Sequence, residues 1–387
     1  MIRNISIGID IGSAKTRVVV GELLKGEKNP KVIGVGESET KGIRHGYVIN
    51  AADTVSSVKN AVASAERNSG IKIKRAFISV SGTTLHSETS SGEAIISKAN
   101  SEVTGLDIKK ALEDSENNLN LNNKKVIHVF PLSFKLDGKD ILGRIEGMCG
   151  NKLEVKALFV TYSSQHLDDL LAVVAEAGVE TIDIIASPIA GSHLALSEKQ
   201  KIVGCGLVNI GSETVSLAVF ENEMLISLQT FSIGSSNITN DIALGLKIPL
   251  EEAENLKLGK ISEECPKKKL DEIIDARLSD IFESIENHLK KIKRNELLPA
   301  GITFIGGGAN VSGLAELSKS FLKLPSQIGA TEMFGNAKTK LRDPSYFVAL
   351  GLVLSSKDDN KYTGSSSSNL FKDLKNSIKS ITKQLMP

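Results

Sequence analysis

Two short glycine-containing turns are the residues best suited to bind an anion. Residues 9–15 (IDIGSAK) join two apolar strand patterns, and residues 208–214 (VNIGSET) repeat this arrangement about 200 positions later. Glycine at such a turn lets backbone N–H groups approach a phosphate closely. One such turn is usually structural, whereas an internal repeat predicts a duplicated domain with a ligand cleft between its halves.

A third glycine-rich turn, residues 303–310 (TFIGGGAN), follows a strand pattern and precedes a helix pattern over 312–321. The N-terminal end of that helix would add a positive potential beside the turn. The sequence contains neither a Walker A loop nor a dinucleotide-binding G-x-G-x-x-G in a strand–helix context. Two hairpin turns holding phosphates, with a Gly-Gly-Gly turn beside the base, together predict a nucleotide cleft.

Alternating strand and helix patterns would position these turns. Two strands are predicted within residues 5–24, one over 76–80 and one over 181–186. Apolar residues at helical spacing predict helices over 51–68 and 168–177. This alternation predicts an α/β fold with mainly parallel sheets. Between these elements, residues 86–125 are polar and are interpreted as rich in loops.

Composition narrows the class of protein. The chain of 387 residues is 41% hydrophobic and 24% charged, as expected for a folded globular protein. A formal net charge of +1 and the absence of tryptophan argue against nucleic acid as a partner. The widely spaced Cys149, Cys205 and Cys265 fit a reducing cytoplasm rather than a disulfide framework. No window is apolar enough to span a bilayer, so any membrane contact would be peripheral.

The end of the chain changes character. Residues 357–368 have almost no apolar side chains and are interpreted as a flexible tether. Residues 369–387 place apolar side chains on one side of a helix and lysines on another, which is typical of a helix on an anionic lipid bilayer. A helix docked on the body or on a partner is the alternative, and the tether argues against docking on the body. The apolar set is Leu370, Phe371, Leu374, Ile378, Ile381 and Leu385, and the basic set is Lys372, Lys375, Lys379 and Lys383.

Longer stretches resemble one family across essentially the whole chain. The turns resemble the nucleotide site of the actin-like ATPases, and within that superfamily the chain resembles FtsA, a family of bacterial cell-division proteins. The resemblance is carried by residues 41–50 (KGIRHGYVIN), 78–82 (ISVSG), 145–155 (IEGMCGNKLEV), 237–243 (NITNDIA), 249–254 (PLEEAE) and 344–352 (PSYFVALGL). The GMCG and NITNDI stretches are far more specific than the glycine turns.

The resemblance implies an α/β, actin-like (ribonuclease H-like) duplicated fold of two lobes, with an inserted FtsA-type subdomain and a C-terminal amphipathic helix. The implied domains are lobe 1 at 1–84, the inserted subdomain (1C) at 85–161, lobe 1 again at 162–200, lobe 2 (2A and 2B) at 201–335, a return to lobe 1 at 336–356, the linker at 357–368 and the membrane-targeting helix at 369–387.

The resemblance also implies which residues would bind ATP and Mg²⁺. Asp10 would hold Mg²⁺ through water, although an Asp that only caps the turn is the alternative. Glu254 and Lys257 would contact the sugar or base, although their spacing fits a solvated ion pair equally well. The remaining residues implied to bind the nucleotide are Gly12, Ser13, Ala14 and Lys15 in the first phosphate loop, Asn209, Gly211, Ser212, Glu213 and Thr214 in the second, Gly234 and Ser235 beside it, and Gly307, Gly308 and Ala309 against the adenine.

Two residues depart from the family pattern. Where the family usually has Asp, this chain has Asn209, whose neutral amide cannot act as a base or an anionic Mg²⁺ partner. His193 lies near the position of a family Glu in the region that orients water, and an ordinary histidine on a helix face is the simpler interpretation. Together these departures predict nucleotide binding with weak or absent hydrolysis, and they leave open whether the protein is an enzyme.

The implied role is a polymer-forming adaptor for cell division. It would bind the C-terminal tail of FtsZ with residues 230–300, associate with itself, contact later division proteins and lie on the cytoplasmic face of the cell membrane at the division site. A predicted helix over 271–291 carries Arg277 near the expected FtsZ site, where a solvated arginine is the alternative. A pilus-assembly scaffold of the same fold, which would lack the terminal helix, and a phosphotransferase, which would need a carboxylate base, remain alternatives.

Overall fold

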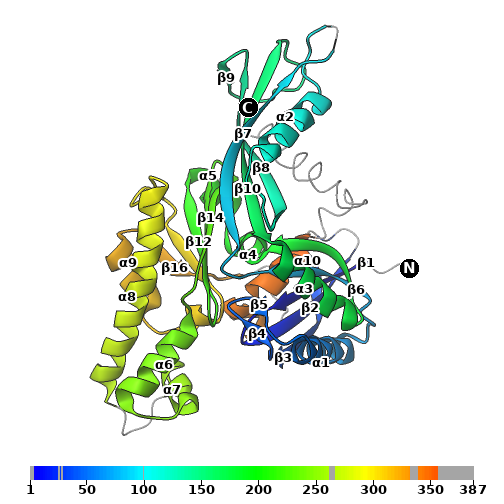
Figure 1. Cartoon of the computed structure of the whole chain (residues 1–387). Helices are drawn as coiled ribbons and strands as arrows, with labels where there is room; N and C mark the ends of the chain where they lie inside the picture. Colours follow the sequence, from blue (N-terminus) through cyan, green and yellow to red (C-terminus); the bar gives the residue numbers. More distant parts are fainter. Residues whose placement is uncertain are drawn as a thin grey trace.

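The computed structural model describes residues 4–24, 27, 29–98, 100–260, 266–331 and 339–355. Two lobes lie side by side and a third body rises from between them (Figure 1). The predicted tether and terminal helix lie outside the described residues. Helices predicted over 51–68, 168–177, 271–291 and 312–321 are present with shifted ends, as α1 (Ala51–Ser69), α3 (Ser164–Glu176), α8 (Lys267–Lys291) and α9 (Leu314–Leu322).

Lobe 1 is built on a five-stranded sheet. In spatial order its strands are β11 (Glu180–Ala186), β6 (Arg75–Val80), β1 (Asn4–Ile11), β2 (Lys15–Leu23) and β3 (Lys31–Glu39). The pairs from β11 to β1 are parallel and those from β1 to β3 are antiparallel. Helix α1 packs on β3, begins where Asn50 accepts a hydrogen bond from the Asp53 N–H, and ends at Gly70 in the left-handed conformation.

Two apolar helices, α4 (Ser187–Ala195) and α10 (Phe347–Ser355), join the lobes. Helix α10 packs on β1 and α4, and α4 also contacts β12 (Cys205–Ile210) of lobe 2. A Cβ atom at Gly351 would lie 1.9 Å from the carbonyl oxygen of Ala190, so only glycine permits this approach of the two backbones. Both helices are buried almost all round, as the apolar sequence of α10 requires and the small side chains of α4 permit.

A nine-stranded sheet runs from lobe 2 into the third body. Its order is β16-β15-β12-β13-β14-β7-β10-β8-β9, and the junction is between β14 and β7, where Gln229 lies opposite His86. The bounds in lobe 2 are β13 (Val215–Glu221), β14 (Met224–Phe231), β15 (Ile302–Ile305), β16 (Ser326–Ile328), α5 (Glu198–Val203), α6 (Ser235–Leu246) and α7 (Leu250–Lys257). Short 3₁₀ turns occupy Gly307–Asn310, Thr339–Arg342 and Pro344–Tyr346.

The third body is the inserted subdomain, which has its own core. It consists of β7 (His86–Ile95), α2 (Gly105–Asn117), β8 (Lys124–Leu136), β9 (Lys139–Ile141) and β10 (Lys152–Ser163). Helix α2 packs on β7 and β10 and buries Ile108, Ala111 and Leu112. The loop-rich interpretation of residues 86–125 is therefore wrong, because a Thr104–Asp107 capping box and a narrow apolar stripe are enough to form a helix here.

The expectation of mainly parallel sheets is also wrong. Only the pairs β1–β6, β6–β11, β12–β15 and β15–β16 are parallel among the described strands. The strands joined at the glycine turns, β1–β2 and β12–β13, can pair only antiparallel, because parallel pairs need a longer crossover. The inserted subdomain adds further antiparallel pairs.

Candidate nucleotide-binding cleft

The two predicted hairpins have nearly the same backbone geometry. In β1–β2 the N–H of Gly12 donates to the carbonyl of Lys15 at 3.2 Å, and in β12–β13 the N–H of Gly211 donates to the carbonyl of Thr214 at 2.8 Å. A Cβ atom would lie 3.1 Å from the carbonyl oxygen at Gly12 and 3.0 Å at Gly211. The repeat in sequence is therefore a repeat in structure, with one copy in each lobe.

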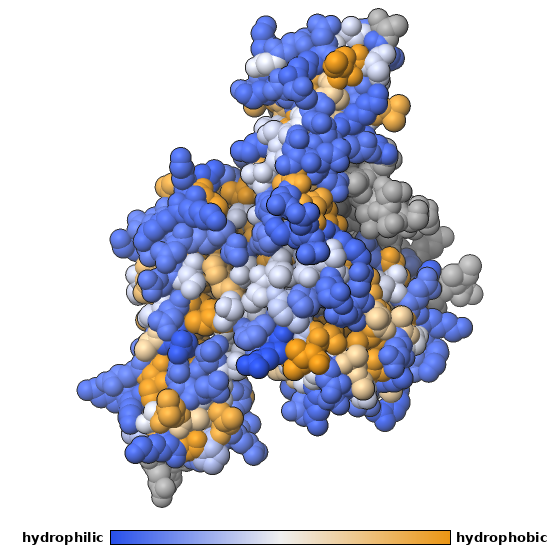
Figure 2. Space-filling view, in the orientation of Figure 1, coloured by the Kyte–Doolittle hydropathy of each residue, from blue (hydrophilic) through white to orange (hydrophobic). Residues whose placement is uncertain are grey.

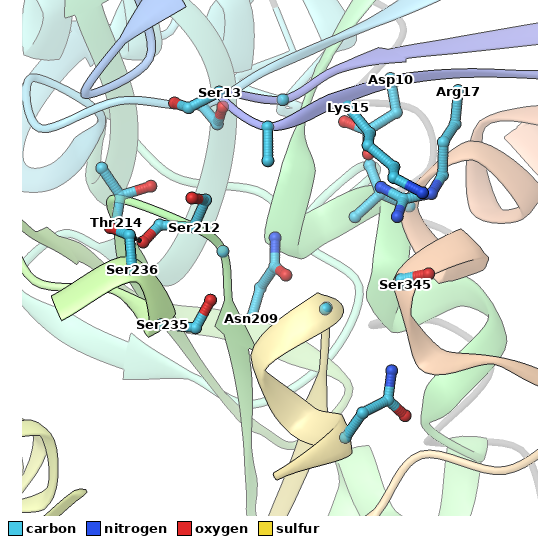
Figure 3. Close-up of a pocket in the computed structure, with 18 of the residues that line it drawn as sticks. Asp10, Ser13, Lys15, Arg17, Asn209, Ser212, Thr214, Ser235, Ser236 and Ser345 are labelled. Atoms are coloured by element: carbon cyan, nitrogen blue, oxygen red, sulfur yellow. Dashed lines mark hydrogen bonds between the residues drawn. The ribbon is translucent and has the colours of Figure 1, made fainter. Parts of the chain in front are cut away.

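A cavity of about 350 Å³ lies between these hairpins. Figure 3 shows Asp10, Lys15 and Arg17 on one side and serine and threonine side chains on the other, with Asn209 between. The volume is in the range of small-molecule sites. The predicted residues that line it are Asp10, Gly12, Ser13, Ala14, Lys15, Asn209, Gly211, Ser212, Thr214, Ser235, Glu254, Lys257 and Gly307.

Asp10 supplies a buried carboxylate at the end of β1. Its Oδ1 accepts a hydrogen bond from the Ser79 hydroxyl at 2.6 Å. Burial raises the pKa of this carboxyl, and the Ser79 hydrogen bond and the positive charge of Arg17 oppose that shift. A bound cation would favour the ionised form, which is the form that can hold Mg²⁺.

Arg17 is a positively charged cleft residue that sequence analysis missed. It lines the cavity, its guanidinium carbon lies 5.1 Å from the centre of the Tyr346 ring, and its buried Nε has no hydrogen-bond partner in the described part of the chain. Side chains two apart on a strand share a face, so the signal was present in the spacing of Lys15 and Arg17. Lys15 itself is half exposed, 3.6 Å from a carboxylate oxygen of Glu37.

The second phosphate loop is fixed to the start of α6. The N–H of Ser235 donates to the carbonyl of Gly211 at 2.9 Å, and the N–H of Ser236 donates to the carbonyl of Ser212 at 2.8 Å. Gly234 is required here because a Cβ atom would lie 2.3 Å from the Ser212 carbonyl oxygen. The positive end of the α6 dipole therefore lies beside the loop.

Glu254 and Lys257 form the expected ion pair, but only its acid is exposed to solvent, with 45% of the Glu254 side chain accessible. The Lys257 side chain is only 5% exposed, and its Nζ donates to Glu254 Oε2 at 2.6 Å, Thr239 Oγ1 at 2.8 Å and the Ser235 carbonyl at 3.2 Å. This network joins α7 to the start of α6 at the wall of the cavity. Both residues line the cavity, Glu254 with its carboxylate partly open and Lys257 with its three N–H groups already bonded.

Five of the predicted residues do not line the cavity. Gly308 and Ala309 are buried beneath it, and a Cβ atom on Gly308 would lie 2.2 Å from Ile210 Cγ2. Gly234 supports the loop from behind, and Glu213 accepts a hydrogen bond from the N–H of His45 at 2.6 Å. His193, the fifth, is half-buried in α4 with its Nδ1 3.2 Å from Ser355 Oγ.

The position of His193 argues against a role in orienting water. Burial, the nearby Lys201 and His128 lower its pKa to about 3, so the ring is neutral at physiological pH. Its contacts are those of a histidine packed between α4 and α10. The simpler of the two interpretations therefore fits this residue better.

Other lining residues come from segments with no recognisable motif. Ser81 follows β6, Ser187 begins α4, and Asn310, Asp343 and Ser345 close the side near the Gly-Gly-Gly turn. The Ser187 hydroxyl is buried without a hydrogen-bond partner among the described residues. With Arg17 Nε it forms a pair of unused donors, and together with Asp10 these groups fit a Mg²⁺–nucleotide in type and charge.

Arg277 lies outside this cleft. Its Nε and Nη2 donate to the two carboxylate oxygens of Asp241 at 2.6 and 3.1 Å, and its Nη1 donates to Asp280 at 3.0 Å. The pair joins α8 to α6, so Arg277 is an element of structure as well as a partly exposed charge.

The fold defines an actin-like protein. The chain resembles a PilM–PilN type IV pilus biogenesis complex with a TM-score of 0.68 and 16% identity, over 90% of this chain and 98% of that one. It resembles MreB5 of Spiroplasma citri bound to ADP with a TM-score of 0.52 and 14% identity, over 93% and 99% of the two chains. These similarities concern the fold.

Sequence comparison identifies the family. Residues 206–351 match the family "Cell division protein FtsA", and residues 82–161 match the "SHS2 domain inserted in FTSA". The chain is 30% identical to the cell division protein FtsA of Bacillus subtilis, over 90% of this chain and 82% of the relative, and 27% identical to that of Pseudomonas aeruginosa, over 90% and 88%. The chain belongs to the FtsA family of cell-division proteins.

Of the helices described, none has the length and apolar character to cross a bilayer.

Proposed function

We propose that this protein binds Mg²⁺–ATP between its lobes and uses the bound state to organise division filaments at the membrane. The observation that carries the proposal is the cavity lined by both copies of the repeated hairpin. Loop N–H groups and Arg17 would hold phosphates, the α6 dipole would favour their negative charge, and Asp10 would hold the ion through water. Lys257 and Glu254 would contact the sugar or base.

Hydrolysis is proposed to be weak or absent. Asn209 lines the cavity where the family usually has Asp, and an amide cannot accept a proton from an attacking water. ATP hydrolysis would then convert the ATP-bound state slowly, if at all. A phosphotransferase of this fold would need a base that this position does not supply.

The test is equilibrium binding of Mg²⁺–ATP together with phosphate release. We expect binding in the micromolar range or tighter, and turnover at least about 100-fold below that of an Asn209→Asp variant that still binds. Ser216→Ala, altered at the paired residue of β13, is the matched control. No binding at millimolar nucleotide would refute the proposed site, and brisk turnover of the natural chain would refute the inactive interpretation.

The second part of the proposal concerns the membrane and FtsZ. The terminal segment 369–387 would lie on anionic lipid on the cytoplasmic face of the cell membrane, with polymerisation supplying avidity. The C-terminal tail of FtsZ would dock on lobe 2, where apolar side chains gather over α6 and α7 (Figure 2) and include the exposed Leu244 and Leu250. Later division proteins would contact the inserted subdomain at the division site.

Two measurements separate this adaptor from the pilus-type alternative. The full chain should float with phosphatidylglycerol vesicles, and a chain that ends at Lys357 should not. Equal flotation of the two would exclude residues 369–387 as the membrane anchor. Binding of a synthetic FtsZ tail should weaken severalfold in Arg277→Glu but not in Arg67→Glu, an exposed arginine of α1 in lobe 1. If the full chain binds neither the lipid vesicles nor the FtsZ tail, the pilus-type scaffold is favoured.

A further inference from the structure

A small hairpin of lobe 1 lies against the second phosphate loop. It consists of β4 (Ile43–Arg44) and β5 (Tyr47–Val48), with His45 and Gly46 at its turn. Both turn residues have positive φ, 50° at His45 and 84° at Gly46, as a two-residue hairpin of this type requires. Its conformation is therefore set locally, and its position is set by what it touches.

On one side the turn is packed on the stem of the inserted subdomain, which we define as residues 81–86 leading into it and 160–163 leading out of it. A Cβ atom at Gly46 would lie 2.5 Å from both the Gly82 Cα and the Ser81 carbonyl oxygen, so the two backbones are in direct contact. The Tyr162 hydroxyl, at the other strand of the stem, lies 3.2 Å from the carbonyl oxygen of Gly46 and 3.0 Å from that of Ser81. The turn thus holds both chain segments that lead into the subdomain.

Tyr47 strengthens this attachment. Its ring stacks on His166 of α3 with centroids 3.7 Å apart and an angle of 15°, and its hydroxyl shares a hydrogen bond with Thr83. Any movement of the turn would therefore have to move the stem or break these contacts.

On the other side the turn is held by Glu213. Its Oε2 accepts a hydrogen bond from the His45 N–H at 2.6 Å, across the boundary between the lobes. Glu213 lies between Ser212 and Thr214, which both line the cavity. A hydrogen bond to an ionised acceptor is about twice as strong as a neutral one, so a carboxylate at this position holds the turn more firmly than a neutral group would.

We propose that Glu213 is a clasp through which the second phosphate loop controls the stem of the inserted subdomain. This inference rests on the proposed nucleotide site for its ligand. Phosphate oxygens bound at Ser212 and Thr214 would hold the loop still, and the carboxylate would then hold the β4–β5 turn and the stem beneath it. In the empty protein the loop is freer and the clasp opens more often.

The linkage has to be reciprocal. A partner that binds the inserted subdomain and displaces its stem would loosen the turn and lower nucleotide affinity by the same factor by which nucleotide weakens that partner. Glu213 is thus a positioning residue, since it acts on the stem through the His45 backbone and does not line the cavity.

Hydrogen exchange of the full chain tests the clasp directly. In the empty protein, Glu213→Ala should speed exchange of the peptide covering 43–48 roughly tenfold, because the His45 N–H loses its acceptor. Glu213→Gln keeps an accepting oxygen and should stay within about threefold of the natural chain. Glu272→Ala, an exposed glutamate in α8, is the matched control and should change nothing at 43–48.

Adding Mg²⁺–ATP then tests the coupling. In the natural chain, nucleotide should slow exchange at 211–216, at 43–48 and at 81–86, whereas in Glu213→Ala it should slow 211–216 alone. Equal exchange at 43–48 in the natural chain and Glu213→Ala overturns the clasp. Protection of 211–216 without 43–48 in the natural chain overturns the coupling and leaves the nucleotide site intact. No protection anywhere, with no measurable binding, refutes the nucleotide site and the coupling together, while the comparison in the empty protein still decides the clasp.

Discussion

The two phosphate hairpins share a backbone and differ in charge. In lobe 1 Asp10 lies opposite Arg17 in the β1–β2 register, and in lobe 2 Asn209 lies opposite Ser216 at the corresponding place in β12–β13. Each copy closes its turn with one hydrogen bond from a glycine N–H. The first copy thus carries a carboxylate and a guanidinium cation where the second carries an amide and a hydroxyl.

The difference indicates a division of labour between the lobes. Lobe 1 supplies full charges that can select a metal–phosphate ligand, and lobe 2 supplies N–H groups, hydroxyls and the α6 dipole. Geometry has been kept in both copies because it depends on one glycine and a strand pair. Charge is set by single side chains and has diverged.

Arg17→Ala should have the largest effect on this comparison. Removing the guanidinium from the cleft should weaken Mg²⁺–ATP binding by roughly 100-fold, since a charged hydrogen-bond donor to phosphate is lost. The corresponding Ser216→Ala should change affinity less than about threefold, because Ser216 bonds Thr230 rather than the cavity. Titration of a fluorescent ATP analogue measures both. Equal losses in the two variants would show that the lobes contribute charge equally.

Gly234→Ala should have the next largest effect, on stability. Its Cβ atom would lie 2.3 Å from the Ser212 carbonyl oxygen, so the second loop must move and the protein should lose about 1–3 kcal/mol of unfolding free energy. Gly307→Ala is the matched control, since its Cβ atom would meet nothing within 4 Å. Urea unfolding followed by circular dichroism distinguishes them. A stable Gly234→Ala would mean that the loop is not fixed to α6.

The hairpins were predictable from sequence, whereas much of the cleft was not. Apolar runs around a glycine turn specify a strand pair locally, and residues 9–15 and 208–214 therefore sufficed. Ser187, Ser81 and Ser345 come from segments with no pattern of their own, brought together only by the packing of α4 and α10. Burial of Lys257 also depends on tertiary contacts, so its spacing from Glu254 could not distinguish a surface pair from a wall of the cavity.

Replacing the acid of lobe 1 by an amide, and the amide of lobe 2 by an acid, should change the Tm by smaller amounts and in opposite directions. Asp10 has a pKa raised above its usual 3.8 by burial, so the folded protein holds its proton more tightly than the unfolded chain. Stability therefore falls as pH rises from about 3.8 through the raised folded pKa. Asp10→Asn should raise the Tm of the nucleotide-free protein by a few degrees at pH 7 and have little effect below pH 3.8.

The opposite substitution, Asn209→Asp, should lower the Tm at pH 7, because it introduces a second carboxylate into the same cleft. Thermal melts of both variants between pH 3.5 and 7.5 measure the pair, with Asp275→Asn, at an exposed position of α8, as a control for a general charge effect. A lower Tm for Asp10→Asn at pH 7 would mean that Arg17 and Ser79 more than offset the cost of burying the carboxylate.

Lys15→Ala should have the smallest effect, although Lys15 is the residue that sequence motifs favour. Its side chain is 49% exposed and lies 3.6 Å from Glu37, so water and salt screen its charge. We expect a loss of affinity for Mg²⁺–ATP of about two- to fivefold at low salt, shrinking toward none at about 0.5 M salt, where the Debye length is only a few ångströms. Arg17→Ala should keep most of its loss at the same salt, because the Arg17 Nε is buried. If Lys15→Ala lost as much affinity as Arg17→Ala, and the loss persisted at high salt, the exposed Lys15 rather than the buried Arg17 would be the main phosphate contact.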